Sequence, residues 1–545
     1  MSGWLIALIQ ALLVGLAGYL IVLILKPGNT TRGTTTSGPG RSPQEMRTRL
    51  VLATIGVLFC AMSFVVLAIA SQPVLRRSEA AQSHAPAKVA VDAIAWVQFR
   101  FVESAQNNSN ALSARALIGP NDTCPDITIG EGRGERMVRR EDPRSRLFGT
   151  LCEFALTLAD PRRVEITHHG KSLWKQTITR SAQDILLLGD TGCRLVQYED
   201  QACNDAAAWP LGKLAAAAAA KPVQLVVHVG DYLYRERPCM RDELPANCNP
   251  GPHGDNEAAW RKDFFEPAKR LLAKAPWIIV RGNHEDCQRG GYGWFYYFGE
   301  PDSPVCQLAH PTSYLSLSGL TFINLDTAHA EDEHAKEMTK NEWALATKAH
   351  IGSKIGPAGP VFFLTHKPLY AVCDKFKVPS PAIATIDYNC KNLDKGELNV
   401  VRDVYANLAS VAAGRPLVIV GGDIHTFQVV DVAAGQDASR ANLTATQVVI
   451  GNGGTLRDDY SGLHGMKEVR YRQEAPKDSN NLSRDDANRK LAYDGTARVW
   501  HSFGFGIVKV KSGAAPSIEL TMHDASGMPA FTCTLGAGLG PTTGC

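Results

Sequence analysis

Two long apolar runs without a charged residue lie near the start of the chain, at 4–25 and at 50–70. Each run is long enough to cross a bilayer as an α-helix. The first run lacks the basic segment that opens a secretory signal peptide, and it is longer than the apolar part of such a peptide. We therefore predict two transmembrane helices, at 1–26 and 49–70, rather than a cleaved signal.

Positive charge dominates the segment between the two runs, which holds Lys26, Arg32, Arg41, Arg47 and Arg49 against Glu45 alone. The positive-inside rule predicts a cytoplasmic loop at 27–48 and places the chain after residue 70 outside, although Arg76 and Arg77 argue mildly for the reverse. We expect the protein in the cell inner membrane, with the rest of the chain on the periplasmic or extracellular side. The stretch at 71–88, rich in Ala, Ser, Gln and Pro, is interpreted as a linker.

Short runs of alternating apolar and polar residues follow at 89–180, and no helix-length periodicity stands out there. This pattern is typical of a small all-β domain, a sandwich. The pair His168-His169 lies in this segment. We interpret it as a surface or turn pair rather than as metal ligands, because no block of ligand-type residues adjoins it.

Strand-like apolar runs alternate with helix-prone stretches over 181–545, which predicts βαβ units around a sheet. Helices are expected at 205–220, 256–274, 339–350 and 398–413, and the late runs at 444–450, 506–510 and 517–521 are expected to be strands of a second sheet. For the helix at 256–274, Asp255 is the expected N-cap, and Pro267 is expected to kink or break the helix midway.

Five short polar blocks mark the predicted strand ends of this α/β segment. They are GDTG at 189–192, GDYLY at 230–234, GNHE at 282–285, TH at 365–366 and GDIH at 422–425, and each follows a mostly apolar run. Each block holds Asp, Asn, His or Tyr, which are metal-ligand types. Because ligands gather at the carboxyl ends of strands in an open α/β sheet, five such strands can build one metal centre. The pattern favours an enzyme over a scaffold.

The order and spacing of these blocks resemble the calcineurin-like metallophosphoesterases and, within them, the purple acid phosphatases. That family pattern reads GDxG, GDxxY, GNH[ED], a lone His after a strand, and GHxH. The resemblance spans Asp190 to His425 and extends weakly to 451–454 and 502–506. It implies a four-layer αββα sandwich, which in many purple acid phosphatases follows a small all-β domain. It also implies two divalent or trivalent metal ions, iron with iron, manganese or zinc.

Carried over residue by residue, the resemblance implies a first metal held by Asp190, Tyr234 and His425, a second held by Asn283 and His366, and Asp231 as the bridge. Asp423 stands where the family has the first His of GHxH. A carboxylate there can remain a ligand of the second metal, and it would favour harder ions such as Mn, Fe or Mg over zinc. The alternative is that Asp423 points elsewhere and the second site is weak.

His284 is the expected catalytic residue, because the corresponding His of the family contacts phosphate and helps to protonate the leaving oxygen, a task that suits the pKa of histidine. Glu285 either orients the His284 ring or is only a surface carboxylate. The further His pair that plant-type purple acid phosphatases carry after the lone His is missing here. We interpret Lys367 as a solvated lysine rather than a replacement for that pair, and His329 as another candidate for substrate contact.

Cysteine spacing supports the outward placement of the chain. Cys60 lies in the second apolar run, and the other 12 of the 13 cysteines fall as near neighbours: Cys124 and Cys152, Cys193 and Cys203, Cys239 and Cys248, Cys287 and Cys306, Cys373 and Cys390, Cys533 and Cys545. An oxidising compartment would favour six local disulfides, although spacing alone does not fix their connectivity. No CxxC motif occurs, which argues against a zinc or redox site at these cysteines.

The resemblance implies a dinuclear-metal phosphoesterase that hydrolyses phosphomonoesters by attack of a metal-bound hydroxide. The apolar runs and the charge bias add that it is membrane-anchored and faces outward. Its partners would be a small phosphorylated substrate and, through the two N-terminal helices, the lipid bilayer. A formal charge of +3 gives no argument for nucleic acid. The alternatives are a phosphodiesterase acting on nucleotides or lipid-linked phosphates, and a catalytically inactive cell-envelope binding protein with a relic metal site.

Overall fold

The fold is described from a computed structural model. The described residues are 92–100, 111–157, 161–196, 199–240, 248, 251–300, 306–308, 312–317, 319–329, 359–368, 376–377, 385–386, 415–432, 445–457, 466–473, 493–511, 517–537 and 542–545. Residues Ala90–Cys545 form one compact unit. The two predicted membrane helices, the loop between them and the linker lie outside the described residues. Among the residues that are described, no helix is long and apolar enough to span a bilayer.

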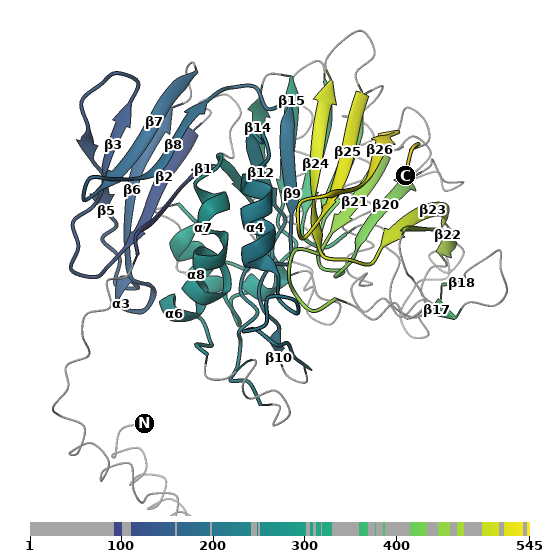
Figure 1. The fold of residues 1–545 in the computed structure, drawn as a ribbon, viewed down its shortest axis with the longest axis horizontal. Helices are drawn as coiled ribbons and strands as arrows, with labels where there is room; N and C mark the ends of the chain where they lie inside the picture. The colour runs from purple at the N-terminus through teal and green to yellow at the C-terminus, as the bar shows by residue number, and fades with distance from the viewer. Residues whose placement is uncertain are drawn as a thin grey trace, which may run out of the picture. The chain divides into compact units, whose positions relative to one another are not determined.

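A ten-stranded sheet runs through the molecule (Figure 1). Three parallel strands lie in its middle: β9 (Asp184–Leu188), β12 (Leu225–His228) and β13 (Trp277–Ile279). Beside β9 lie the antiparallel strands β24 (Gly504–Lys511), β25 (Ser517–Asp524) and β26 (Pro529–Leu535). The prediction that 506–510 and 517–521 belong to a second sheet is therefore wrong, because β24 pairs with β9. Beside β13 lie β1 (Ile94–Phe99), β2 (Ala111–Ile118), β6 (Thr150–Thr157) and β5 (Val138–Arg139).

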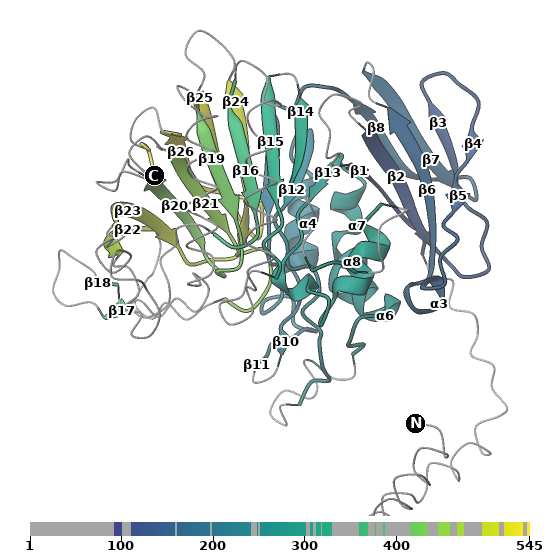
Figure 2. The ribbon, with the colours of Figure 1, turned by 180° about the vertical axis from the view of Figure 1, so that it is seen from behind.

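An eight-stranded sheet covers one face of the first sheet (Figure 2). Its order is β14 (Ser313–Leu317), β15 (Leu320–Leu325), β16 (Val361–Thr365), β19 (Leu417–Gly421), β21 (Ala445–Ile450), β20 (Phe427–Val432), β23 (Tyr493–Trp500) and β22 (Met466–Gln473). Strands β15, β16, β19 and β21 are parallel. Two short hairpins, β10 (Leu195–Val196) with β11 (Glu199–Asp200) and β17 (Phe376–Lys377) with β18 (Thr385–Ile386), lie outside both sheets.

Side-chain alternation along the strands explains the layers. In β9, Ile185 and Leu187 belong to the apolar core shared with the eight-stranded sheet, whereas Leu186 and Leu188 belong to the core shared with the helices. Successive strand residues point to opposite faces, so a continuous apolar run is buried on both. Each such side chain stabilises the fold by about 1.5–3 kcal/mol relative to full exposure. Helices and mixed sheets thus form the α/β arrangement expected of a metallophosphoesterase, while the predicted helices at 339–350 and 398–413 lie outside the described residues.

The helices on the ten-stranded sheet are α4 (Leu211–Ala219), α6 (Glu257–Trp260), α7 (Glu266–Leu272) and α8 (Gly291–Tyr297), with the short α3 (Ser145–Phe148) beside them. The helix predicted at 205–220 is shorter than predicted, that predicted at 256–274 is interrupted, and α3 and α8 were not predicted. A π-helical segment, Arg261–Phe265, separates α6 from α7, and the Glu266 N–H donates to the carbonyl of Arg261. Pro267 lacks the N–H that a regular turn needs, so the predicted break is confirmed.

Asn256, rather than the predicted Asp255, caps the first of these helices. The Ala259 N–H donates to Asn256 Oδ1 at 3.1 Å. Asp255 instead accepts the Trp260 indole N–H at 2.7 Å and the Gly293 N–H at 3.0 Å, and so ties α6 to α8. Asp and Asn both cap helices well, so the sequence alone does not tell which of the two neighbours is the cap. The contacts of Asp255 with Trp260 and Gly293 decide it.

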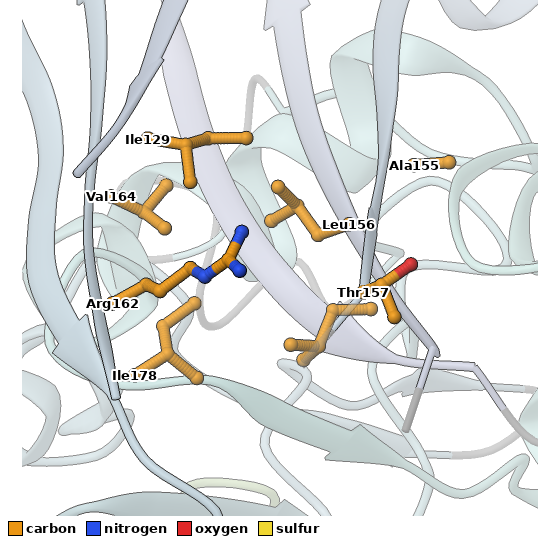
Figure 3. A pocket seen from close by; sticks show the side chains of 8 residues that line it. Ile129, Ala155, Leu156, Thr157, Arg162, Val164 and Ile178 are labelled. Atoms are coloured by element: carbon orange, nitrogen blue, oxygen red, sulfur yellow. The ribbon is translucent and has the colours of Figure 1, made fainter. Parts of the chain in front are cut away.

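Among the described residues between 92 and 178, α3 is the one helix, and the strands are shared between two sheets. Strand β1 pairs in parallel with β13 at Gln98 and Trp277, so this segment continues the ten-stranded sheet. A separate four-stranded sheet holds β4 (Glu135–Arg136), β3 (Asp126–Ile129), β7 (Arg162–His168) and β8 (Lys171–Ile178). Between the two sheets lies a cavity of about 220 Å³, lined by apolar side chains together with Thr157 and Arg162 (Figure 3).

Candidate metal centre

The five polar blocks follow the carboxyl ends of β9, β12, β13, β16 and β19, where the two large sheets face each other. Asp190, Asp231 and Asp423 each come after a glycine and have left-handed backbones, with φ of 54°, 61° and 64°. Of the other described non-glycine residues, only His169 and Ala537 have positive φ. Such strain costs roughly 1–2 kcal/mol per residue and gathers at functional sites. The blocks are therefore turns that aim carboxylates at one point.

The three residues expected at the first metal lie together. The Tyr234 hydroxyl is 3.2 Å from Asp190 Oδ1 and 3.0 Å from His425 Nε2. His425 Nε2 is 3.6 Å from Asp190 Oδ1. The Tyr234 hydroxyl also donates to Asp231 Oδ2, which joins this group to the expected bridging residue. All four side chains are buried.

The residues expected at the second metal surround His366. Its Nε2 lies 3.2 Å from Asn283 Oδ1, 3.3 Å from Asp231 Oδ1 and 3.6 Å from Asp423 Oδ1. Its Nδ1 lies 2.7 Å from the carbonyl of Val229, which can only accept, so Nδ1 carries a proton and donates. This backbone contact fixes the ring and leaves Nε2 facing the three oxygens. Metal-binding histidines commonly donate their other ring N–H to a backbone carbonyl or carboxylate in this way.

Asp423 points into the same group rather than away from it. Its backbone N–H donates to both oxygens of Asp190, at 3.1 and 3.2 Å. Its Oδ1 faces His366, whereas its buried Oδ2 has no hydrogen-bond partner among the described residues. A buried carboxylate oxygen without a donor is costly unless a cation serves it.

The electrostatics of the site favour positive charge at its centre. Burial raises the pKa of Asp190 to about 7, with the carboxylates of Asp231 and Asp423 adding to the effect. Burial alone would lower the pKa of His366, but Asp231 and Asp423 facing its ring hold that pKa well above its usual value. Asp190, Asp231 and His366 each offer a ligand atom within 4.8 Å of the others. Carboxylate, imidazole, phenol and amide donors crowded in this way fit two divalent or trivalent cations.

Comparison with known proteins agrees with this geometry. Residues 184–427 match the family model of the calcineurin-like phosphoesterases, a stretch that includes every block from Asp190 to His425. These residues form a calcineurin-like phosphoesterase domain. The resemblance inferred from the five blocks is confirmed at this level.

Two solved structures are similar to the chain at low identity. Purple acid phosphatase PPD1 from yellow lupin (Lupinus luteus) seeds shares 13% identity at a TM-score of 0.46, with 80% of this chain and 72% of that chain covered. GAP50, the anchor in the inner membrane complex of Plasmodium, shares 14% identity at a TM-score of 0.36, with 65% and 88% covered. Neither likeness is close enough to carry a functional argument. The comparison with curated proteins gave no match.

Beside the metal-ligand candidates of the phosphoesterase domain, His284 is held by two partners that the sequence did not reveal. Its Nδ1 lies 2.8 Å from Glu236 Oε1 and 2.7 Å from Arg289 Nη2, and Arg289 Nε donates to the same Glu236 oxygen at 2.5 Å. Its ring packs on Tyr234, with centroids 3.6 Å apart. Burial, with Arg289 adding to it, lowers the pKa of His284 to about 4.

Glu285 takes neither of its two predicted roles. It is fully buried, and its carboxylate accepts the backbone N–H groups of Asp231, Tyr232 and Leu233 at 2.8–3.0 Å and of Gly282 at 3.1 Å. Burial and the nearby Asp231 raise the pKa of Glu285 to about 8. The Glu285 carboxylate therefore positions the GDYLY turn and not the His284 ring. It is buried because the backbone N–H groups of that turn supply its hydrogen bonds.

Of the two further residues considered for substrate contact, the structure tests only Lys367, and His329 stays a prediction. Lys367 is only 3% exposed, so its interpretation as a solvated lysine is wrong; its backbone N–H donates to the hydroxyl of Thr327. His329 Nδ1 lies 2.6 Å from Asp286 Oδ2, so this histidine packs against the residue that follows Glu285.

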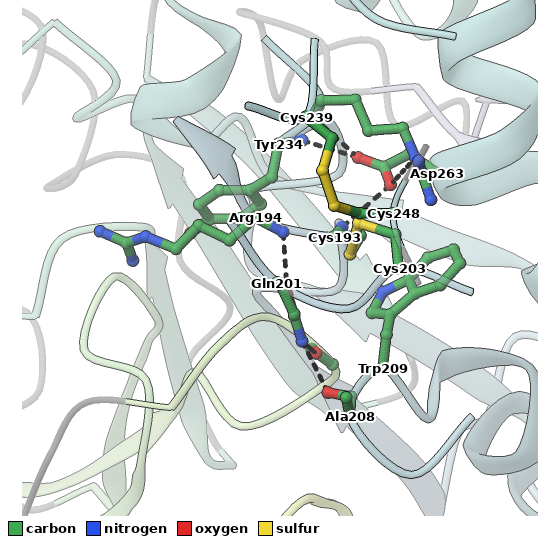
Figure 4. Close-up of a disulfide and its surroundings, with 12 residues drawn as sticks. Cys193, Arg194, Gln201, Cys203, Ala208, Trp209, Tyr234, Cys239, Cys248 and Asp263 are labelled. Atoms are coloured by element: carbon green, nitrogen blue, oxygen red, sulfur yellow. Dashed lines mark hydrogen bonds and ion pairs between the residues drawn. A yellow bond between two sulfur atoms is a disulfide. The ribbon is translucent and has the colours of Figure 1, made fainter. Parts of the chain in front are cut away.

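One buried carboxylate connects the loop after β9 with the loop after β12 (Figure 4). Asp263, in the π-helical segment, accepts from the Cys193 N–H at 2.9 Å and from the Tyr234 N–H at 2.7 Å. The disulfide between Cys193 and Cys203 closes the loop that carries Arg194, whose Nη1 lies 2.9 Å from His425 Nδ1. Arg194 thus adds a cationic side chain beside the centre, and sequence reasoning missed it because it lies outside the five blocks of ligand-type residues.

Proposed function

We propose that this chain is a dinuclear-metal phosphoesterase whose main reaction is hydrolysis of phosphomonoesters. The observation that carries the proposal is the meeting of three buried carboxylates with two imidazoles, a phenol and an amide, one carboxylate oxygen having no partner among the described residues. One cation would be held by Asp190, Tyr234 and His425, and the other by Asn283, His366 and Asp423, with Asp231 between them. Such a pair supplies charge neutralisation at phosphoryl oxygens and an activated water at neutral pH.

The chain's own residues account for binding and proton transfer in this proposal. Arg194 and Arg289 place guanidinium groups beside His425 and His284, where they can attract and orient an anionic ester. His284 would contact the ester; because its pKa is lowered to about 4, its ring is neutral near neutral pH and would give a proton to the leaving oxygen only in acid. Glu236, 2.8 Å from His284 Nδ1, orients that ring. Asp423 in place of imidazole favours harder ions, so iron paired with iron or manganese fits better than iron with zinc.

The proposal extends to the cellular setting. The two apolar runs at 4–25 and 50–70 would anchor the chain in the inner membrane, with the phosphoesterase domain on the periplasmic or extracellular side. Five disulfides among the described cysteines support an oxidising compartment. Cleavage of the domain by protease added to intact spheroplasts would support this orientation, and protection until the membrane is opened would contradict it.

Asp231→Asn tests the catalytic proposal. We expect loss of nearly all turnover of an aryl phosphate, with altered metal content, because Asp231 faces both halves of the centre. Retention of more than about a tenth of the rate, a barrier change of only about 1.4 kcal/mol, would contradict the assignment. Faster turnover of an aryl phosphodiester than of the monoester would favour the phosphodiesterase alternative. Wild-type protein with two metals and no turnover of either would favour a binding protein.

A further inference from the structure

Three ligand-type side chains outside the phosphoesterase centre meet on the four-stranded sheet. They are Asp122, His168 and His169, and one ligand atom of each lies within 4.8 Å of the others. Asp122 Oδ1 is 2.7 Å from His169 Nε2, and Asp122 Oδ2 is 3.5 Å from His168 Nε2. His169 lies in the turn from β7 to β8, as the sequence predicted, whereas His168 is buried and ends β7. A carboxylate 47 positions before His169 adjoins both histidines, contrary to the prediction that no ligand-type residue does so.

The hairpin has an unusual backbone that brings the two rings to one side. Consecutive residues of a regular strand point to opposite faces. Here the pairing of β7 with β8 shifts between Ile166 and Thr167, and the turn has left-handed backbones at His169, with φ of 48°, and at Gly170, with φ of 74°. The two imidazole centroids therefore lie only 4.1 Å apart. A histidine in the left-handed region is uncommon and is often a sign of a functional constraint.

The backbone of Asp122 is held in place by two hydrogen bonds. The Asp122 N–H donates to the carbonyl of Gly119 at 3.1 Å, and Arg139 Nη2 donates to the Asp122 carbonyl at 2.7 Å. The disulfide from Cys124 to Cys152 fixes the next residues to β6. The His168 side chain is 8% exposed, whereas those of His169 and Asp122 are 63% and 29% exposed. The three side chains thus combine one buried histidine with a histidine and a carboxylate that solvent can reach.

We propose that Asp122, His168 and His169 form a metal site of their own for one divalent transition-metal ion such as zinc, separate from the phosphoesterase centre. Two imidazole nitrogens and one carboxylate oxygen suit zinc, cobalt or nickel, whereas calcium and magnesium prefer oxygen alone. His168 Nε2, now 3.0 Å from the Thr123 carbonyl, exchanges that contact for the ion. The bound ion fastens the β7–β8 turn to the 119–124 turn.

Zinc counting on the full chain tests the site. The probe is zinc alone, brought to equilibrium by dialysis, with zinc per chain measured in wild type, in His169→Asn and in the control His253→Ala. Asparagine tolerates the left-handed backbone and keeps the turn, while it removes the imidazole. His253 is an exposed histidine of the phosphoesterase domain. We expect His169→Asn to bind one zinc fewer than wild type, His253→Ala to match wild type, and aryl phosphatase activity to be the same in all three.

Equal zinc in wild type and His169→Asn would overturn the proposal, and so would an equal loss in His253→Ala, which would indicate binding at scattered surface histidines. Hydrogen exchange gives a second readout that is independent of the phosphoesterase centre. Zinc should slow amide exchange at 119–124 and at 166–171 in wild type but not in His169→Asn, and magnesium should slow it in neither. No effect of zinc on these amides in wild type would also overturn the proposal.

Discussion

Asp263 offers the sharpest test of how the fold supports the centre, because one buried carboxylate holds two ligand-bearing loops. Its Oδ1 accepts from the Cys193 N–H and, at 2.8 Å, from Arg235 Nε, while its Oδ2 accepts from the Tyr234 N–H. The side chains of Asp263 and Arg235 are 0% and 1% exposed. We predict that Asp263→Asn lowers both the free energy of unfolding and the phosphatase rate.

The size of the stability loss follows from the ion pair. Removing one partner of a buried pair costs about 3–5 kcal/mol, because the remaining charge is left without compensation. Burial raises the pKa of Asp263 although Arg235 opposes the rise, so Arg235 does not fully offset the cost of burying the carboxylate. We therefore expect the loss in unfolding free energy at the lower end of this range, about 3 kcal/mol. That is a large share of the roughly 5–15 kcal/mol that stabilises a typical domain.

Urea unfolding followed by tryptophan fluorescence measures the loss, with Asp92→Asn as the matched control. Asp92 pairs with Lys269 at 2.9 Å, but the Asp92 side chain is 84% exposed, so the same chemical change should cost less than about 1 kcal/mol there. The phosphatase rate should be compared without urea, at a temperature at which both variants are folded. A loss below about 1 kcal/mol in Asp263→Asn, or an unchanged rate, would refute the view that Asp263 positions the two loops.

Three further predictions concern the ligands and the cysteines. Iron-loaded, active protein should show a visible charge-transfer band that Tyr234→Phe removes; a band that persists in the variant excludes Tyr234 as its source. Asp423→Ala should lose one of two metals, and Asp423→His should regain it with a preference shifted towards zinc, because imidazole is the softer donor; an alanine variant that keeps both metals would make Asp423 a turn residue. Thiol titration of the denatured, unreduced chain should find few free thiols, since ten described cysteines form five disulfides, and a majority of free thiols would contradict that pairing.

The gathering of the five blocks could be predicted because each is a local pattern. A glycine and an aspartate directly after an apolar strand, as in Gly230-Asp231, specify the strand end, the turn and the ligand type together. Parallel pairing then brings three such ends to one edge of the ten-stranded sheet and two to one edge of the eight-stranded sheet, which faces it. Pro267 was equally informative, because the loss of one N–H disturbs a helix whatever surrounds it.

What escaped prediction depends on partners far away in the chain. Glu285 and Lys367 read as exposed polar residues, and only the packing of distant loops shows that both are buried. Glu236 and Asp122 gave no signal, because each acts through a histidine that lies tens of positions away. Asp255 and Asn256 are equally suitable helix caps by residue type. The Trp260 indole donates to Asp255, which leaves Asn256 to cap the helix.

The ten-stranded sheet has a consequence for the order in which the chain can fold during synthesis. Strand β9 carries the first ligand turn, yet one of its two neighbours is β24, whose Gly506 pairs with Leu187. The other flank of the parallel strands depends on β1, which is made before any of them. A ribosome therefore releases the stretch matched by the family model, 184–427, long before the strand that completes its sheet. Pairing across such sequence distances is slow and leaves strand edges open, so the last stage of folding has to follow synthesis of residue 511, and nascent chains halted before that point should aggregate.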